Sequence, residues 1–266
     1  MIYTHDFTSF VIPMKALSQP IYHIENAKKR LEKAGASFTL HIPKLVIERG
    51  EFVAFVGESG CGKTTLLDLL GLVSQPTSAT RFEVDFNSGN PESISTAAES
   101  RLAEFRRRHV GYVLQSGGLL PFLSVGENIL LVRRANSLGN PAEGETIARQ
   151  LGIGGQWRKK PAFLSGGQRQ RAAIARALAH SPALVLADEP TGAVDRVTAR
   201  EIRTLLGEAA RARQATVLIV THDEPLLSGF TDRVFTFRVV KQSADSVEST
   251  LIETTWAERR QAGGSV

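Results

Sequence analysis

Apolar and polar positions alternate along this chain with two different periods. Short apolar or alternating runs predict strands at 21–24, 38–42, 45–47, 52–56, 81–86, 110–114, 184–187, 216–220, 234–240 and 247–254. Apolar positions at helical spacing and helix-start signals predict helices at 66–70, 100–108, 125–136, 143–151 and 168–179. Strands that alternate with helices are typical of an α/β protein with a parallel sheet.

The predicted elements divide the chain into regions. The short strands before residue 57 predict a small antiparallel sheet, and the helical block at about 116–165 separates two strand-rich regions as an inserted subdomain. Residues 1–20 are expected to form an irregular extension with one short strand near 10–12. Residues 21–240 then form the main domain, and 241–266 complete a C-terminal hairpin and tail whose last ten residues are expected to fray.

A glycine-rich loop joins the apolar run 52–56 to the helix that is expected to end near Gly71. Its sequence is Gly-Glu-Ser-Gly-Cys-Gly-Lys-Thr-Thr, and such a loop between strand and helix predicts a phosphate-binding P-loop. Lys63 can reach the β and γ phosphates, and the Thr64 hydroxyl can ligate Mg²⁺. The expected phosphate-binding residues are Gly57, Ser59, Gly60, Cys61, Gly62, Lys63, Thr64 and Thr65. A purely structural glycine turn is the weaker alternative, because this pattern arises by chance in roughly 1% of chains this long.

Polar side chains follow three of the predicted buried strands. Asp188 and Glu189 follow one strand, His222 follows a second, and Gln115 follows a third. Because the carboxyl ends of parallel strands lie at one edge of a sheet, these side chains are expected to meet the P-loop there. We expect Asp188 to hold Mg²⁺, Glu189 to polarise the attacking water, His222 to contact the γ-phosphate and the Gln115 amide to reach both metal and water.

A second anion-binding pattern occurs at Leu164-Ser165-Gly166-Gly167-Gln168, where a helix is expected to begin. A hydroxyl, exposed N–H groups and the helix dipole together favour phosphate. About 100 residues and a subdomain separate this pattern from the P-loop, so a γ-phosphate held by both predicts two chains that face each other.

Composition restricts the class of protein. Of 266 residues, 42% are hydrophobic and 22% charged, which is ordinary for a globular protein, and the net charge of +5 is a mild excess. The basic run at 106–108 has no interleaved aromatic residues, so we expect no nucleic-acid partner. No apolar stretch approaches the roughly 18–20 residues that span a bilayer, so any membrane role is expected to act through a partner. The lone Cys61 excludes an internal disulfide and fits a reducing compartment.

Two further hypotheses concern single positions. Cys61 is either a small filler residue or a thiol whose pKa is lowered by the field of the P-loop. Leu119, Leu120 and Phe122 either form an apolar groove for a permease helix or pack in the core of the helical subdomain.

Together these motifs resemble those of the ATP-binding subunits of ABC transporters over about residues 21–240. The matching segments are the P-loop (Walker A), Gln115 (Q-loop), 164–168 (signature), 184–189 (Walker B), Asp195 (D-loop) and His222 (H-loop). The resemblance implies a P-loop NTPase (RecA-like) core with an antiparallel β-subdomain and an inserted α-helical subdomain. It also implies a head-to-tail dimer, expected to be a homodimer, that binds two ATP molecules with Mg²⁺. Ser165, Gly167, Gln168 and Asp195 of one chain would then complete the site of the other.

Such a dimer would hydrolyse ATP to drive a membrane permease, which places the protein in the cytoplasm on the inner face of the membrane. The stretch 187–195 is similar to the subgroup that serves lipoprotein release, macrolide export and FtsE-like mechanotransmission. The alternatives are an ATPase of the same superfamily that acts on chromosomes or ribosomes, and a module that binds nucleotide without hydrolysing it.

The chain departs from the family pattern at three places. The aromatic residue that stacks on adenine is expected near position 31, where the chain has Leu31, with Tyr22 and Phe38 as nearby candidates. Val194 replaces the usual leucine before Asp195, and the usual Asp-Gly hairpin after His222 is missing.

Overall fold

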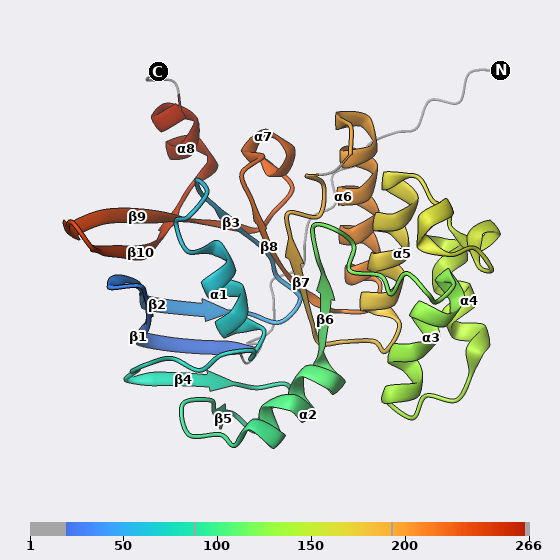
Figure 1. Cartoon of the computed structure of the whole chain (residues 1–266), viewed down its shortest axis with the longest axis horizontal. Coiled ribbons are helices and arrows are strands. Elements are labelled where there is room, and N and C mark those ends of the chain that lie inside the picture. The colour runs from blue at the N-terminus through green and yellow to red at the C-terminus, as the bar shows by residue number, and fades with distance from the viewer. Residues whose placement is uncertain (1–19, 88, 193, 264–266) are drawn as a thin grey trace.

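The computed structural model describes residues 20–263 apart from 88 and 193. Within these residues ten strands form one sheet in the order β5-β4-β1-β2-β10-β9-β3-β8-β7-β6 (Figure 1). The strands are β1 (Tyr22–Lys33), β2 (Ala36–Ile47), β3 (Phe52–Val56), β4 (Arg81–Val84), β5 (Glu92–Ser93), β6 (Val110–Val113), β7 (Leu184–Asp188), β8 (Thr216–Thr221), β9 (Arg233–Ser243) and β10 (Ser246–Thr254). The helices are α1 (Lys63–Leu70), α2 (Glu99–His109), α3 (Val125–Ala135), α4 (Pro141–Gln150), α5 (Gly166–Leu178), α6 (Arg196–Arg211), α7 (Glu224–Leu227) and α8 (Trp256–Gly263). The strand predicted at 10–12 lies outside the described residues.

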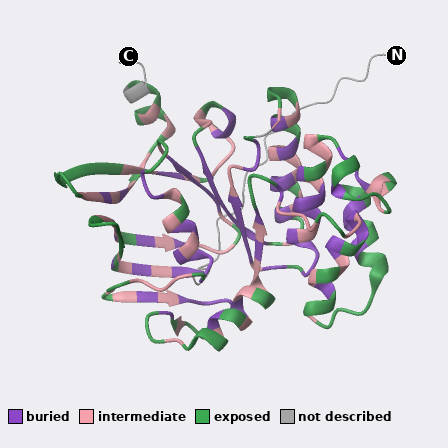
Figure 2. Cartoon of the chain, in the orientation of Figure 1, coloured by how far each residue is buried: buried purple, intermediate pink, exposed green. Residues whose placement is uncertain are grey.

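Strands β3, β8, β7 and β6 form a parallel core that is covered on both faces. Every residue of β3 is buried (Figure 2). Successive side chains of a strand point to opposite faces of the sheet. Val53 and Phe55 therefore pack with α1, whereas Ala54 and Val56 pack with α3, α5 and α6. This is the doubly covered parallel sheet that the alternating pattern predicts.

The antiparallel end of the sheet has two long strands where three short ones were predicted. The strands predicted separately at 38–42 and 45–47 are one strand, because β2 continues through Pro43 and pairs with β1 on both sides of it. The residue facing Pro43 is Asn26, whose φ of 48° bends β1 where proline has no N–H to donate. A turn at Ala34 and Gly35, with φ of 50° and 82°, closes the hairpin.

The C-terminal hairpin joins the two parts of the sheet. β10 pairs in parallel with β2 and antiparallel with β9, while β9 pairs in parallel with β3. The predicted small antiparallel sheet is therefore one end of a continuous sheet. The predicted strands 234–240 and 247–254 are confirmed, and both extend further than expected.

Two helices correct the sequence prediction. The chain after Asp195 was given no helix, yet α6 spans 16 residues and buries Ala199, Ile202 and Leu206 on one face. The last ten residues were expected to fray, but α8 is ordered through Gly263. Thr255 and Glu258 form a reciprocal capping box at its start, and Arg259 forms an ion pair with Glu224 of α7.

The chain between β6 and β7 is helical, although these two strands are neighbours in the sheet. Ser124 begins α3 with the predicted capping box, in which its backbone N–H donates to Glu127 Oε2 at 2.7 Å and its Oγ accepts from Glu127 N–H at 3.2 Å. The buried Arg133 joins α3 to the end of α5 through the carbonyl of Ala179 at 2.7 Å. Among the described residues we find no helix that combines the length and apolar character needed to cross a membrane.

Candidate nucleotide site

The P-loop has the backbone that its glycines predict. Gly60 and Gly62 have φ of 80° and 109°, a region that side chains rarely adopt. A Cβ on Gly62 would lie 2.9 Å from Phe38 Cζ, so glycine is required here for space as well as for conformation. Gly62 is also the N-cap of α1 and offers no side chain to its first N–H groups, which leaves them free to bind an anion.

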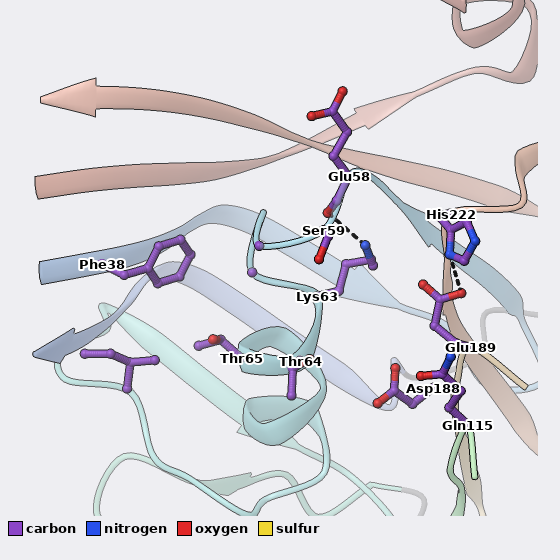
Figure 3. A pocket seen from close by; sticks show the side chains of 13 residues that line it. Phe38, Glu58, Ser59, Lys63, Thr64, Thr65, Gln115, Asp188, Glu189 and His222 are labelled. Carbon is purple, nitrogen blue, oxygen red and sulfur yellow. Dashed lines mark hydrogen bonds and ion pairs between the residues drawn. The ribbon is translucent and has the colours of Figure 1, made fainter. Parts of the chain in front are cut away.

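A cavity of about 810 Å³ opens above the P-loop (Figure 3). It is lined by Leu31, Phe38, Glu58, Ser59, Gly60, Gly62, Lys63, Thr64, Thr65, Gln115, Asp188, Glu189 and His222. The ammonium of Lys63 donates to the carbonyls of Gly57 at 2.6 Å and Glu58 at 2.8 Å, so a positive charge is held over the loop.

The structure brings the predicted strand-end residues together. Asp188 ends β7, Glu189 follows it, and His222 follows β8. His222 Nδ1 lies 2.7 Å from Glu189 Oε2, and the Thr221 hydroxyl lies 3.4 Å from the same oxygen. Glu189 has φ of 45° and is largely buried, with 13% of its side chain exposed, whereas His222 is 66% exposed. A carboxylate held by a histidine in this way has one oxygen fixed and one free to accept a proton from water.

The site concentrates negative charge next to Lys63. Burial, followed by the charge of Glu189, raises the pKa of Asp188, and Lys63 partly opposes this shift. The Thr64 hydroxyl, the Gln115 amide and the Asp188 carboxylate line the same cavity and offer oxygen atoms. These are the hard donors that Mg²⁺ prefers, so the side chains present fit this ion.

Cys61 does not behave as the reactive thiol that one hypothesis described. Cys61 is 4% exposed, and a Cβ added to Gly57 would lie 2.7 Å from the Cys61 Sγ. Burial raises the pKa of the thiol, and this effect outweighs the opposing charge of Lys63. The hypothesis of a lowered pKa is therefore wrong in direction, because burial outweighs the lowering by the charge of Lys63 and by the backbone N–H groups of residues 61 and 63.

The two candidates for the adenine contact are separated by their burial. Phe38 is partly exposed and lines the cavity together with Leu31. Tyr22 is fully buried, and its hydroxyl donates to the carbonyl of Leu70. Phe38 is thus the aromatic ring within reach of a bound base.

The signature residues form a second cavity, of about 460 Å³, at the start of α5 and α6. It is lined by Gly152, Ser165, Gly166, Gly167, Gln168, Arg171, Val194, Asp195, Thr198 and Glu201. Ser165 and Gln168 form a capping box, since Ser165 N–H donates to Gln168 Oε1 at 3.0 Å and Ser165 Oγ accepts from Gln168 N–H at 3.3 Å. The two cavities share no lining residue.

Asp195 caps α6 at the rim of the second cavity. One carboxylate oxygen accepts the N–H groups of Val197 and Thr198, each at 3.0 Å, and the other accepts the Thr198 hydroxyl at 2.7 Å. These hydrogen bonds lower the pKa of Asp195 and fix its orientation. Sequence reasoning found Asp195 only through the family resemblance, although an Asp before the apolar positions 199, 202 and 206 is a helix-start signal.

The segment after Gln115 was interpreted either as a groove for a permease helix or as part of the core, and each interpretation fits part of it. Leu119 packs against the core cluster, and Leu120 exchanges hydrogen bonds with Asn128 of α3. Phe122 is 67% exposed. Core packing thus accounts for Leu119, and Phe122 is the residue that remains open to a partner.

A covered parallel sheet with a P-loop and carboxylates at its strand ends defines a P-loop nucleoside triphosphatase. The family model described as "ABC transporter" matches residues 40–192. Over 201 residues the chain is 43% identical to the lipoprotein-releasing system ATP-binding protein LolD of Anaeromyxobacter dehalogenans, covering 73% of this chain and 80% of that protein. It is 41% identical to the ABC transporter ATP-binding protein YxdL of Bacillus subtilis, covering 71% and 72%.

Solved structures agree with this match. A dimeric post-hydrolysis structure of the ATP-binding cassette MJ0796, bound to ADP and Pi, superposes with a TM-score of 0.68 at 30% identity, covering 81% of this chain and 93% of that one. The chain therefore belongs to the ABC transporter family, as an ATP-binding subunit with ATPase activity.

Proposed function

We propose that two copies of this chain close head to tail on two ATP molecules and that closure and hydrolysis drive a membrane permease. The observation that supports this proposal most is that the P-loop and the signature residues line two cavities with no residue in common. A cavity with the P-loop but no signature, and a cavity with the signature but no P-loop, complete each other only across two chains. The dimeric structures of MJ0796 support this arrangement.

In the closed pair, each residue has a role that follows from its position. The P-loop N–H groups and Lys63 bind the phosphates, and Phe38 packs on the adenine. Ser165 and Gly167 of the second chain cover the γ-phosphate from the other side. This covering excludes bulk water and strengthens the electrostatic interactions inside the site.

Hydrolysis needs one ordered water and a base. Glu189 accepts a proton from the attacking water, and His222 holds the Glu189 carboxylate in place while its exposed ring is left to meet the γ-phosphate. Thr64, Gln115 and Asp188 would hold Mg²⁺, which when bound neutralises charge on the phosphates. The arrangement thus places the base, the charge-neutralising groups and the phosphate site at one edge of the sheet.

The partner outside the pair is a permease of the export or release type, and the chain works on the inner face of the membrane. The support is the resemblance to LolD, whose name describes a lipoprotein-releasing system. The exposed Phe122, close after Gln115, gives a contact for such a partner. An ATPase that acts on chromosomes or ribosomes has no specific observation in its favour, since YxdL is named an ABC transporter protein and LolD a part of a lipoprotein-releasing system.

The decisive experiment uses the Glu189→Gln variant with ATP and Mg²⁺. Loss of the carboxylate stops hydrolysis but leaves binding intact, so the closed pair should accumulate and light scattering should show a doubled mass. Glu99→Gln, an exposed change on α2 away from both cavities, is the matched control and should keep wild-type turnover. A Glu189→Gln protein that stays monomeric with ATP bound would contradict the proposed pairing.

The permease contact has its own test. Phe122→Asp should abolish recovery of the chain with membranes while leaving its ATPase activity near wild type. Val73→Asp, at another exposed apolar residue (56% exposed), is the control and should leave recovery unchanged. Equal recovery of both variants would exclude Phe122 as the contact.

A further inference from the structure

Ser249 of β10 is a polar residue with no exposed surface. A hydroxyl in this position needs a partner inside the protein, because an unpaired buried polar group costs free energy. Its partner is the main-chain carbonyl of Cys61, which accepts the Ser249 hydroxyl at 2.5 Å. The C-terminal hairpin thus makes a buried hydrogen bond to the middle of the P-loop, 188 residues earlier in the sequence.

The bonded carbonyl determines the direction of one phosphate-site N–H. In a trans peptide the carbonyl of Cys61 and the N–H of Gly62 lie in one plane and point in opposite directions. Gly62 lines the nucleotide cavity, and its φ of 109° leaves the peptide before it without support from a regular helix or strand. Because the Ser249 hydroxyl of β10 binds this carbonyl, the Gly62 N–H points away from Ser249.

Aromatic rings also pack around this part of the loop. Phe38 lies against Gly62, and Phe237 of β9 lies 3.1 Å from where a Cβ on Gly57 would be. These aromatic contacts resist sliding of the loop but cannot select which way a peptide plane faces. A hydrogen bond is directional and makes that selection.

We propose that Ser249 is a positioning residue of the phosphate site, which orients the Cys61–Gly62 peptide before nucleotide binds. This inference rests on the proposed role of the P-loop N–H groups in phosphate binding. Without the hydroxyl, the peptide can rotate in the free protein, and ATP must restore its orientation on binding. The cost therefore falls on affinity and not on the chemical step.

The test compares Ser249→Ala with Ser246→Ala. Ser246 lies on the same strand, and its Oγ accepts from Ser37 Oγ at 3.1 Å, so this control also loses one hydrogen bond but none to the P-loop. We expect Ser249→Ala to raise the Kd for ATP and for ADP about five- to tenfold, with kcat at saturating ATP within about twofold of wild type. Ser246→Ala should match wild type in both quantities.

A second readout does not depend on catalysis. Cys61 is the only cysteine of the chain, so its alkylation by iodoacetamide in the nucleotide-free protein reports opening of the loop. Ser249→Ala should speed this reaction severalfold at a temperature where the variant is fully folded by circular dichroism. Ser249→Thr keeps the hydroxyl and should restore both the slow alkylation and the wild-type Kd.

The outcomes separate the two proposals. If wild-type protein binds no ATP, the proposed function fails. If wild type binds ATP and Ser249→Ala matches it in Kd and alkylation rate, only the positioning role fails. If Ser249→Ala does not fold, the hydrogen-exchange rate of the Gly62 amide is compared between Ser249→Thr and wild type. Both proteins keep the hydroxyl, so different exchange rates would contradict its role.

Discussion

The P-loop cavity and the signature cavity both include the start of a helix, but they are built in different ways. The first is a glycine-rich loop between a strand and a helix, with two glycines at positive φ and the ammonium of Lys63 held over it. The second is an ordinary helix start, whose Ser165 and Gln168 already satisfy each other. In the proposed pairing, the first half-site is therefore expected to bind phosphate in the single chain, whereas the second is expected to act only when it is presented to a partner.

Mixing two inactive variants should give the largest change in ATPase activity. It also tests most directly whether the two half-sites lie on different chains. Lys63→Ala removes the positive charge that binds the phosphates. Ser165→Asp keeps a helix cap but brings a negative charge toward the phosphate bound by the partner. Each alone should lower ATPase activity roughly 100- to 1,000-fold. A mixture should recover activity toward about a quarter of wild type, since half of randomly formed pairs carry one of two intact sites.

The matched control for the mixing experiment is Ser124→Asp, at the other capping box, on α3. It makes the same chemical change at a helix start that lines neither cavity and should keep wild-type activity. The mixture of Lys63→Ala and Ser165→Asp must first be shown to form mixed pairs. If its ATPase activity then does not recover, one chain supplies both halves of a site.

Glycine-to-alanine changes in the two half-sites should differ in size. At Gly62 the added Cβ meets a φ of 109° and the ring of Phe38, so ATP affinity should fall roughly 10- to 100-fold. At Gly167 the backbone is unstrained and the Cβ meets the Thr198 methyl, so affinity of the single chain should be unchanged and turnover only a few-fold lower. Calorimetric titration with ATP and an ATPase assay measure both, and equal losses of affinity would contradict the comparison.

The capping boxes at Ser124 and Ser165 permit a smaller, paired test. Gln168→Ala and Glu127→Ala each remove the side chain that returns to a Ser backbone N–H, so each should lower Tm by roughly 1–3 °C. Only Gln168→Ala should also reduce ATPase activity, because its box borders the signature cavity. An equal effect on activity would show that α3 and α5 contribute through stability alone.

The smallest effect concerns the reactivity of Cys61. Because burial raises the pKa of its thiol, less thiolate is present at any given pH than for a free cysteine. Alkylation should therefore be several-fold slower than for a model thiol near pH 7.5 and should increase as pH rises toward the raised pKa. Measured rates from pH 6.5 to 9.5 check this, and a fast reaction already at neutral pH would contradict the burial of the thiol.

How much the sequence predicts depends on how local the cause is. The P-loop strand, loop and helix follow from residues 52–70 alone, because glycine, the apolar run and the helix start are local signals. The box at Ser124 was predicted for the same reason. α6 and α8 begin at Asp195 and Thr255 with equally local capping signals, so these helices were predictable and were missed.

Other features have non-local causes. Nothing in the sequence shows that Ser249 lies beneath the P-loop, because that contact depends on β10 entering the sheet beside β2. The continuity of β2 through Pro43 likewise depends on the bend at Asn26 in another strand. The motif residues were found from their types and order, while the residues that support them were found only in three dimensions.

The place of the C-terminal hairpin has a consequence for how the protein is made. Because β9 and β10 lie between β2 and β3, a chain still emerging from the ribosome carries its P-loop strand with one side unpaired until residues 233–254 appear. The nascent protein thus exposes two open edges in the centre of its future sheet and relies on late strands to close them. Premature termination near residue 230 should consequently yield an aggregating product, and not a shorter working enzyme.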